Sequence, residues 1–197
     1  MNKTKVNSIA VDIAECALFV ALMSVFTLFV KIPFYPVPLT FQTTICILAG
    51  LLLGAKKGAV SMAVYCFTGL VGIPVFSGMS GGFAYVLQPT FGYIIGFIAS
   101  AAVAGAVAGR KGLPFRRYVE GALSALLVNY LIGIPHFALI WKFYLNNADL
   151  GKYVIEYNLL YIPKDAVLSI IAAVAAWQVL PYIHRRVKST LKKDSSD

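Results

Sequence analysis

Long apolar segments without a polar face are the feature that most constrains this chain. Residues 94–108 and 166–180 are apolar on every side, and similar stretches recur along most of the sequence. Of the 197 residues, 59% are hydrophobic and 13% are charged, against roughly 25% charged in an average soluble domain. A globular fold cannot hide so much apolar surface, and a transmembrane barrel would show short segments of alternating hydrophobicity. The sequence therefore predicts an all-α integral membrane protein.

Breaks at proline, glycine and charge clusters divide the chain into six expected spans within one transmembrane domain. These cover residues 9–30, 41–53, 59–73, 83–108, 119–141 and 163–183, and a basic tail follows at 184–197. The second and third spans are short for a bilayer at 1.5 Å per residue. A cleaved signal is not expected, because Asp12 and Glu15 interrupt the first apolar run and further spans follow it.

Basic residues are distributed unevenly between the two sides of the expected bundle. Thirteen of the 17 lysines and arginines fall in the two terminal segments and in the joints at 56–57 and 110–117. The positive-inside rule then predicts that both termini are cytoplasmic, in a bacterial cytoplasmic membrane, with anionic lipid as a secondary contact. No nucleic-acid partner is expected, because these residues mark helix ends and form no patch interleaved with aromatic side chains.

Two unusual loops lie on the opposite, outer side. Residues 32–43 contain three prolines, and residues 72–83 are rich in glycine and carry no charge. Non-helical backbone near a membrane needs protein or trapped water to satisfy its amides, which favours a cavity between the loops. Transporters also place substrate at short segments interrupted by glycine and proline. Two ordinary tight connections are the alternative.

Lys164 and Asp165 are expected in the first turn of the sixth span, just inside Pro163 and level with these loops. The Asp165 carboxylate accepts hydrogen bonds, while Lys164 and the free amides of a helix start favour an anion. Ionisable residues within spans are costly and usually functional. The alternative is that Asp165 only caps its helix.

Other polar residues lie within the expected spans. Thr90, Tyr93 and Phe97 recur on one stripe of the fourth span, which suits either a ligand contact or the core. Asn129, in the middle of the fifth span, is either a ligand contact or a hydrogen-bonding link between helices.

Catalysis has little support in the sequence. Ser80 lies in a Gly-x-Ser-Gly tetrapeptide like that of rhomboid proteases, with His136 as the conceivable base, but Leu139 replaces the glycine those enzymes have after the histidine. No Walker A motif and no metal-ligand spacing is present in the sequence. We therefore expect neither an enzyme nor a cofactor.

Several ordered motifs resemble the BioY family over nearly the whole chain. They are Pro-x-Pro-x-Thr-x-Gln at 36–42, Ala-Gly-Leu-Leu-Leu-Gly at 49–54, Gly-Ile-Pro-Val-Phe at 72–76, Gly-Gly at 81–82, Pro-Thr-x-Gly-Tyr at 89–93 and Pro-x-Asp at 163–165. The chain departs from the family pattern at Gln88, where many members have glycine. It also departs at Leu168, where many have lysine.

The resemblance implies a six-helix subunit that captures biotin from outside under lid-like loops. Such a subunit is the substrate component of an energy-coupling-factor transporter, working with a transmembrane coupling protein and two ATPase subunits. Asp165 then suits the ureido N–H groups of biotin, and Lys164 or a helix start suits its carboxylate. The expected substrate contacts are Asp165, Lys164, Tyr93, Thr90, Gln42, Thr43, Phe41, Gly81, Gly82 and Asn129.

A stripe of small residues runs along the first span, formed by Ala10, Ala14, Ala17 and Ala21. Such a stripe lets another helix approach closely, either within the chain or from a partner. Similarity to these transporters favours docking of the coupling protein. Two other functions remain open: a self-sufficient secondary carrier and an intramembrane serine protease.

Overall fold

The computed structural model describes residues 3–29, 31–32, 39–109, 114–146 and 150–193. These residues form six α-helices, which agrees with the expected all-α class. The helices are α1 (Lys3–Leu28), α2 (Gln42–Leu53), α3 (Ala55–Leu70), α4 (Phe91–Ala108), α5 (Phe115–Leu139) and α6 (Leu150–Lys193). Shorter elements are the antiparallel strands β1 (Lys31–Ile32) and β2 (Leu39–Thr40), the 3-10 turn η1 (Phe83–Leu87) and the π-helical turn η2 (Ile140–Tyr144).

Within the described residues, four segments are long and apolar enough to cross a membrane. They are Ile9–Leu28, Phe91–Ala108, Phe115–Tyr144 and Tyr161–Tyr182. By contrast α2 and α3 have 12 and 16 residues, which at 1.5 Å per residue gives about 18 and 24 Å. Both are shorter than the roughly 30 Å hydrocarbon core of a bilayer. The second and third helices are therefore the short ones, as the sequence predicts.

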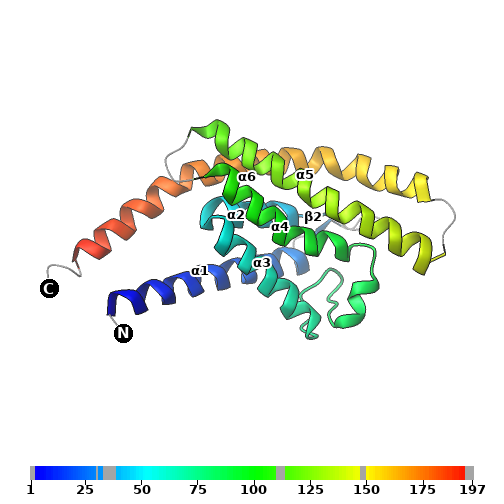
Figure 1. The fold of residues 1–197 in the computed structure, drawn as a ribbon, viewed down its shortest axis with the longest axis horizontal. Coiled ribbons are helices and arrows are strands. Elements are labelled where there is room, and N and C mark those ends of the chain that lie inside the picture. The colour runs from blue at the N-terminus through cyan, green and yellow to red at the C-terminus, as the bar shows by residue number, and fades with distance from the viewer. Residues whose placement is uncertain (1–2, 30, 33–38, 110–113, 147–149, 194–197) are drawn as a thin grey trace.

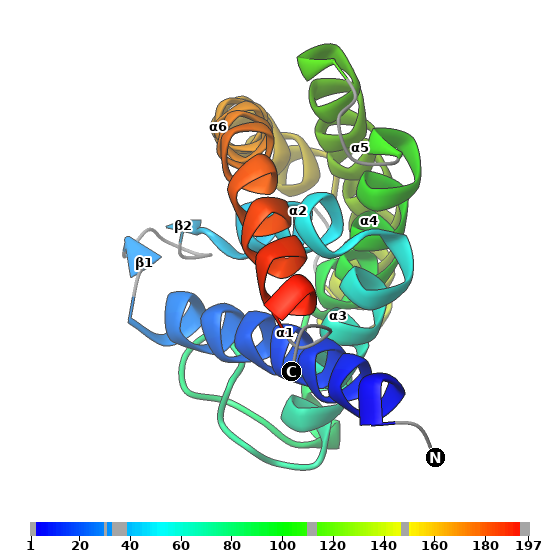
Figure 2. The ribbon, with the colours of Figure 1, turned by 90° about the vertical axis from the view of Figure 1, so that its left-hand side faces the viewer.

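The arrangement of the helices separates two ends of the bundle. The start of α1, the end of α6, the α2–α3 joint and the start of α5 lie towards one end, whereas the start of α6 lies at the other (Figure 1). Seen along the bundle, α2 lies in the centre (Figure 2), where it packs against α1, α3, α4, α5 and α6. Figure 1 also shows that the start of α2 and strand β2 lie part-way along the bundle rather than at an end.

A single residue, Gly54, joins α2 to α3. Its φ of +82° favours glycine. Helices α2 and α3 then run so close together that a Cβ at Gly58 would lie 2.8 Å from the Cα of Gly50. Helix α4 approaches the joint closely as well, because a Cβ at Gly105 would lie 2.2 Å from the backbone nitrogen of Ala55. The absence of side chains at these positions lets the α2–α3 hairpin pack tightly upon itself and upon α4.

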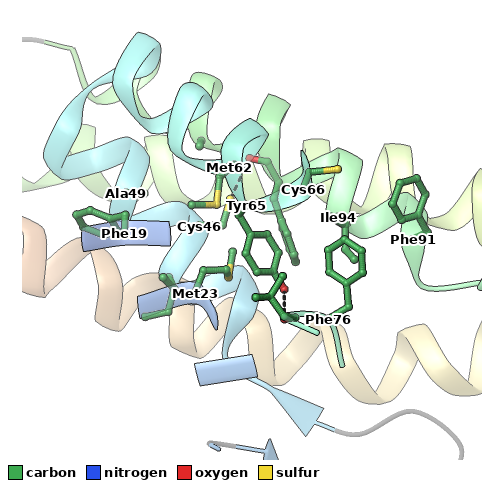
Figure 3. Packing of buried hydrophobic residues seen from close by; sticks show 14 of the residues in the cluster. Phe19, Met23, Cys46, Ala49, Met62, Tyr65, Cys66, Phe76, Phe91 and Ile94 are labelled. Carbon is green, nitrogen blue, oxygen red and sulfur yellow. Dashed lines mark hydrogen bonds between the residues drawn. The ribbon is translucent and has the colours of Figure 1, made fainter. Parts of the chain in front are cut away.

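The larger of the two buried clusters fills the space between α1, α2, α3, α4 and the loop at 71–82. Tyr65 of α3 lies near its centre, with Met23 and Phe76 on either side (Figure 3). On α1 the buried side chains are Phe19, Met23 and Thr27, which recur every four residues and so form one face of that helix. A second cluster joins α2, α4, α5 and α6.

Helix α4 begins at Phe91, not at residue 83 where the span was expected to start. Between these positions lie η1 and the extended residue Gln88, which has φ −82° and ψ 136°. Because proline disfavours helical geometry in the residue before it, Pro89 accounts for the interruption.

Helix α6 begins at Leu150 and continues through Pro163. The expectation that Lys164 and Asp165 stand in a first helical turn is therefore wrong, and no helix start offers free amides to an anion there. Transmembrane helices tolerate proline because neighbouring groups satisfy the freed carbonyl. Lys164 and Asp165 must then act through their side chains.

Candidate functional site

Asp165 is a buried carboxylate within α6, with 5% of its surface exposed. The hydroxyl of Tyr130 on α5 donates a 2.9 Å hydrogen bond to Asp165 Oδ2. The ammonium of Lys164 forms an ion pair with Oδ1 at 2.8 Å. Apart from this ion pair, Oδ1 accepts no hydrogen bond from the residues described. Both carboxylate oxygens are thus engaged, Oδ2 by the Tyr130 hydroxyl and Oδ1 by the Lys164 charge.

Lys164 connects α6 to strand β2. Its ammonium donates a 2.9 Å hydrogen bond to the carbonyl of Thr40 and lies 5.5 Å from the centre of the Tyr161 ring. The Thr40 hydroxyl in turn donates to Gln42 Oε1 at 3.1 Å. The end of the proline-rich loop is therefore tied to the same ammonium that faces Asp165. Residues 33–38 of that loop lie outside the described residues.

Gln42, at the start of α2, has both ends of its amide engaged. Oε1 accepts from Thr40, and Nε2 donates a 3.1 Å hydrogen bond to the Tyr65 hydroxyl on α3. Gln42 is buried between these partners. The Gln42 amide thus connects Thr40, whose carbonyl binds Lys164, to Tyr65 on α3.

Tyr93 and Asn129 border the same region on α4 and α5. The Tyr93 ring packs edge-on against Tyr130 at a centroid distance of 5.7 Å. A Cβ at Gly133 would lie 2.3 Å from the same Tyr93 ring. Asn129, with 1% exposed surface, has its Oδ1 against Gly96 and without a hydrogen bond from the described residues. The side-chain oxygen of Asn129 is therefore a buried hydrogen-bond acceptor on the residue next to Tyr130, which bonds to Asp165.

Three further expected contacts, Phe41, Thr43 and Thr90, make no hydrogen bond or ion pair with Asp165 in the described part of the chain. Phe41 packs edge-on against Phe26 of α1 at 6.4 Å, and Thr43 is half-buried. Thr90 flanks the start of α4, where its hydroxyl hydrogen-bonds with Tyr85. Burial raises the pKa of Tyr85, and the bond with Thr90 opposes that rise.

The glycine-rich loop folds back upon the end of α3. Phe76 and Ser80 pair through backbone hydrogen bonds of 2.9 and 3.3 Å, and the Phe76 ring is fully buried. Gly82 has a φ of +96° and donates from its backbone to the carbonyl of Gly69 at 2.7 Å. Gly81 approaches so closely that a Cβ there would lie 2.5 Å from the carbonyl oxygen of Ile73. Gly82 is thus favoured by its positive φ, whereas Gly81 is favoured because it lacks a side chain.

The alanine stripe of α1 is turned away from the bundle. All four alanines, at positions 10, 14, 17 and 21, are exposed, whereas Phe19, Met23 and Thr27 are buried. At 100° per residue, Ala17 and Ala21 project almost opposite to Phe19 and Met23. The stripe is therefore not buried against another helix in the described part of the chain.

Sequence reasoning missed several residues of this region. Tyr130 gives Asp165 its hydrogen bond, Thr40 and Tyr65 hold Gln42, and Thr44 carries a buried hydroxyl without a hydrogen bond to the described residues. The only available signal was that a buried carboxylate requires a donor. Periodicity alone does not say which hydroxyl supplies it.

Comparisons with known proteins identify the family of this chain. A BioY family model matches residues 1–185. The chain belongs to the BioY family. It is 40% identical over 139 residues to the probable biotin transporter BioY of Lysinibacillus sphaericus, covering 70% of each chain. It is 47% identical over 124 residues to that of Pyrococcus horikoshii, covering 63% of this chain and 72% of the relative.

A solved structure extends the comparison to the fold. The crystal structure of the S-component for biotin from an ECF-type ABC transporter matches this BioY-family chain with a TM-score of 0.67 and 25% identity. The match covers 91% of this chain and 94% of that one. Together with the long apolar helices, it identifies a multi-pass protein of the cell membrane.

Proposed function

We propose that this chain captures biotin from outside the cell as the substrate-binding subunit of an ECF-type transporter. The observation that carries the proposal is the buried Asp165 carboxylate, whose Oδ1 is paired with the Lys164 ammonium but accepts no hydrogen bond from the described residues. The ureido group of biotin presents N–H donors, and a carboxylate in a water-poor site makes a charge-assisted hydrogen bond to them. The relatives named as biotin transporters support this assignment.

Lys164 is the proposed partner of the biotin carboxylate. Its ammonium has three N–H donors; one is given to the Thr40 carbonyl, and the charge is also paired with Asp165 Oδ1. The aromatic rings of Tyr93 and Tyr130, which meet edge-on near Asp165, are the proposed neighbours of the fused rings of the ligand. The region thus offers an acceptor, a cation and apolar surface to one small molecule.

The proposed topology has six spans and cytoplasmic termini. Lys57, Arg116 and Arg117 lie near the α2–α3 joint and the start of α5, at the end of the bundle where α1 begins. The positive-inside rule assigns that end to the cytoplasm. The loop at 71–90 then faces outward.

The proposed energy source is a pair of partner ATPases, since the sequence has no phosphate-binding motif. The exposed alanines of α1 are the proposed docking surface for the transmembrane coupling protein, because small residues allow close helix contact in lipid. No ligand or partner beyond these is required by the proposal.

Calorimetric titration of the purified chain with biotin, dethiobiotin and an unrelated vitamin tests the binding function. Saturable binding of biotin but not of the unrelated vitamin is expected, and absence of biotin binding would refute the proposal. Reconstitution in vesicles with and without the coupling protein and ATPases tests the transport role. Uptake that needs neither ATP nor these partners would favour the self-sufficient carrier.

A further inference from the structure

A continuous series of polar contacts leads from the candidate site to α1. Its first part joins Asp165 and Lys164 through Thr40 to Gln42, as described above. Gln42 then donates to the Tyr65 hydroxyl at 3.1 Å. Tyr65, on α3, is fully buried, and its hydroxyl oxygen is the point at which the series divides.

One branch reaches the glycine-rich loop and the other reaches α1. The Tyr65 hydroxyl donates to the carbonyl of Val75 at 2.9 Å, the contact drawn as a dashed line below its ring (Figure 3). The same oxygen lies 3.3 Å from Thr27 Oγ1 on α1, a residue that is also fully buried. Thr27 donates to the carbonyl of Met23 within α1 at 2.6 Å.

The contacts of Tyr65 and Thr27 cannot all be hydrogen bonds at the same time. Tyr65 and Thr27 have one hydroxyl proton each, and the shorter distances assign them to the carbonyls of Val75 and Met23. No proton then remains for the contact between the two hydroxyl oxygens. If the Val75 carbonyl moves away, the Tyr65 proton is free to turn to Thr27. Tyr65 thus has two alternative acceptors, one on the loop and one on α1.

We propose that Tyr65 is a positioning residue that couples occupancy of the site to the outer half of α1. The inference rests on the proposed function. A biotin carboxylate that draws the Lys164 ammonium towards itself weakens the bond of Lys164 to the Thr40 carbonyl. Thr40, and through it Gln42, is then free to shift. A shift of Gln42 changes the donor that Tyr65 receives, and with it the balance between Val75 and Thr27. Coupling of this kind requires an element with two arrangements, which the single Tyr65 proton provides.

Helix α1 is suited to respond because little of it is buried. Its inner face is held by Phe19, Met23 and Thr27, while the alanine stripe on the other face is exposed. Segments with few buried contacts open most readily. A change at Thr27 is therefore transmitted to the helix proposed to meet the coupling protein.

Hydrogen–deuterium exchange of the full chain in detergent, with and without biotin, tests the coupling. In the wild type, biotin should slow exchange both around Asp165 on α6 and in residues 20–28 of α1. Typical coupling between sites corresponds to about 5- to 150-fold, so a slowing of about fivefold or more is expected in α1. Calorimetric titration of the same sample gives the affinity separately.

Tyr65→Phe should keep the biotin response around Asp165 while the biotin response of residues 20–28 falls to a ratio of about one. Thr27→Val removes only the α1 branch and should give the same result, which provides a second test if Tyr65→Phe folds poorly. Ser24→Ala is the matched control, because among the described residues the Ser24 hydroxyl bonds only to the carbonyl of Val20 within α1. Its biotin response should equal that of the wild type.

Three results would overturn the inference. One is a normal α1 response in Tyr65→Phe or Thr27→Val. Another is a wild type in which biotin binds and protects α6 but leaves α1 unchanged, which would leave the proposed function intact. The third is a wild type that does not bind biotin, which would refute the proposed function together with the coupling.

Discussion

Tyr130 and Asp165 are joined across α5 and α6 by a 2.9 Å hydrogen bond that occupies only one of the two carboxylate oxygens. The tyrosine therefore orients the carboxylate and leaves Oδ1, which is paired with the Lys164 ammonium, as an acceptor. An acceptor that is already oriented loses little freedom when a ligand binds, and this favours affinity.

Asp165→Asn should bind biotin more weakly. The amide keeps the shape of the side chain but removes the charge and half the acceptor capacity. Losing a charge-assisted hydrogen bond costs about 1.5–3 kcal/mol, or roughly 10- to 150-fold in affinity. Titration calorimetry in detergent measures the change. Glu120→Gln, a carboxylate paired with Arg116 at the other end of the bundle, is the control and should bind normally. Wild-type affinity in Asp165→Asn would assign the ureido contact to another residue.

Lys164→Met should reduce the affinity for biotin more than the affinity for biotin amide. Methionine keeps an aliphatic stem but loses the ammonium, so the difference between the two ligands isolates the interaction with the biotin carboxylate. The lost bond to the Thr40 carbonyl affects both ligands alike. Parallel titrations with the two ligands measure this difference. Equal losses for both would show that Lys164 acts only on the protein.

Tyr130→Phe should lower the stability of the protein. The substitution leaves a buried carboxylate oxygen without its donor, at a cost of about 1–3 kcal/mol. Thermal unfolding in detergent without biotin should then occur at a lower temperature than in the wild type. Tyr182→Phe is the control, because Tyr182 is 72% exposed. An unchanged unfolding temperature in Tyr130→Phe would mean that the carboxylate finds another donor.

Gly81→Val and Gly82→Val should both weaken biotin binding. At Gly82 a β-branched residue cannot readily adopt the φ of +96°. At Gly81 the obstacle is the carbonyl of Ile73, which would lie 2.5 Å from the new Cβ. Titration of both variants measures the effect, with Gly151→Ala as control because open space surrounds that position. Normal affinity in both valine variants would reduce this loop to a simple connection.

Tryptophan at Ala14, Ala17 or Ala21 should leave biotin binding intact and abolish ATP-dependent uptake. All three positions are exposed on α1, so the added bulk blocks a close helix contact rather than the site. Copurification with the coupling protein and uptake in vesicles measure the effect. Leu127→Trp, at a 61% exposed position of α5, should copurify normally. Normal copurification of the α1 variants would assign the docking surface to another helix.

The class of the fold and the short second and third helices followed from the sequence, because apolar length and breaking residues are local properties. The expectation that proline interrupts a helix was correct at Pro89, because Gln88 before it is extended. The same expectation was wrong at Pro163, which lies within α6. In a bilayer, breaking a helix exposes backbone groups to lipid, so the helix continues at the cost of one hydrogen bond.

The contacts within the candidate site were less predictable than the residues themselves. Asp165 stands out in the sequence as a charge in an apolar segment, but its partner Tyr130 does so only once α5 and α6 are side by side. Gln42 was expected to meet the ligand, and the structure shows both ends of its amide bonded to Thr40 and Tyr65. Such partners depend on the relative placement of helices distant in sequence.

The one-residue joint at Gly54 also limits how the protein can be engineered. An epitope tag, a protease site or a fluorescent reporter inserted there would separate Gly50 from Gly58 and push Ala55 away from Gly105, where the backbones already touch. Dividing the gene at this codon to express two fragments would part the central helix from the helix that carries Tyr65. The same crowding makes the joint a poor site for natural insertions, so we expect length variation among homologues to fall in other connections.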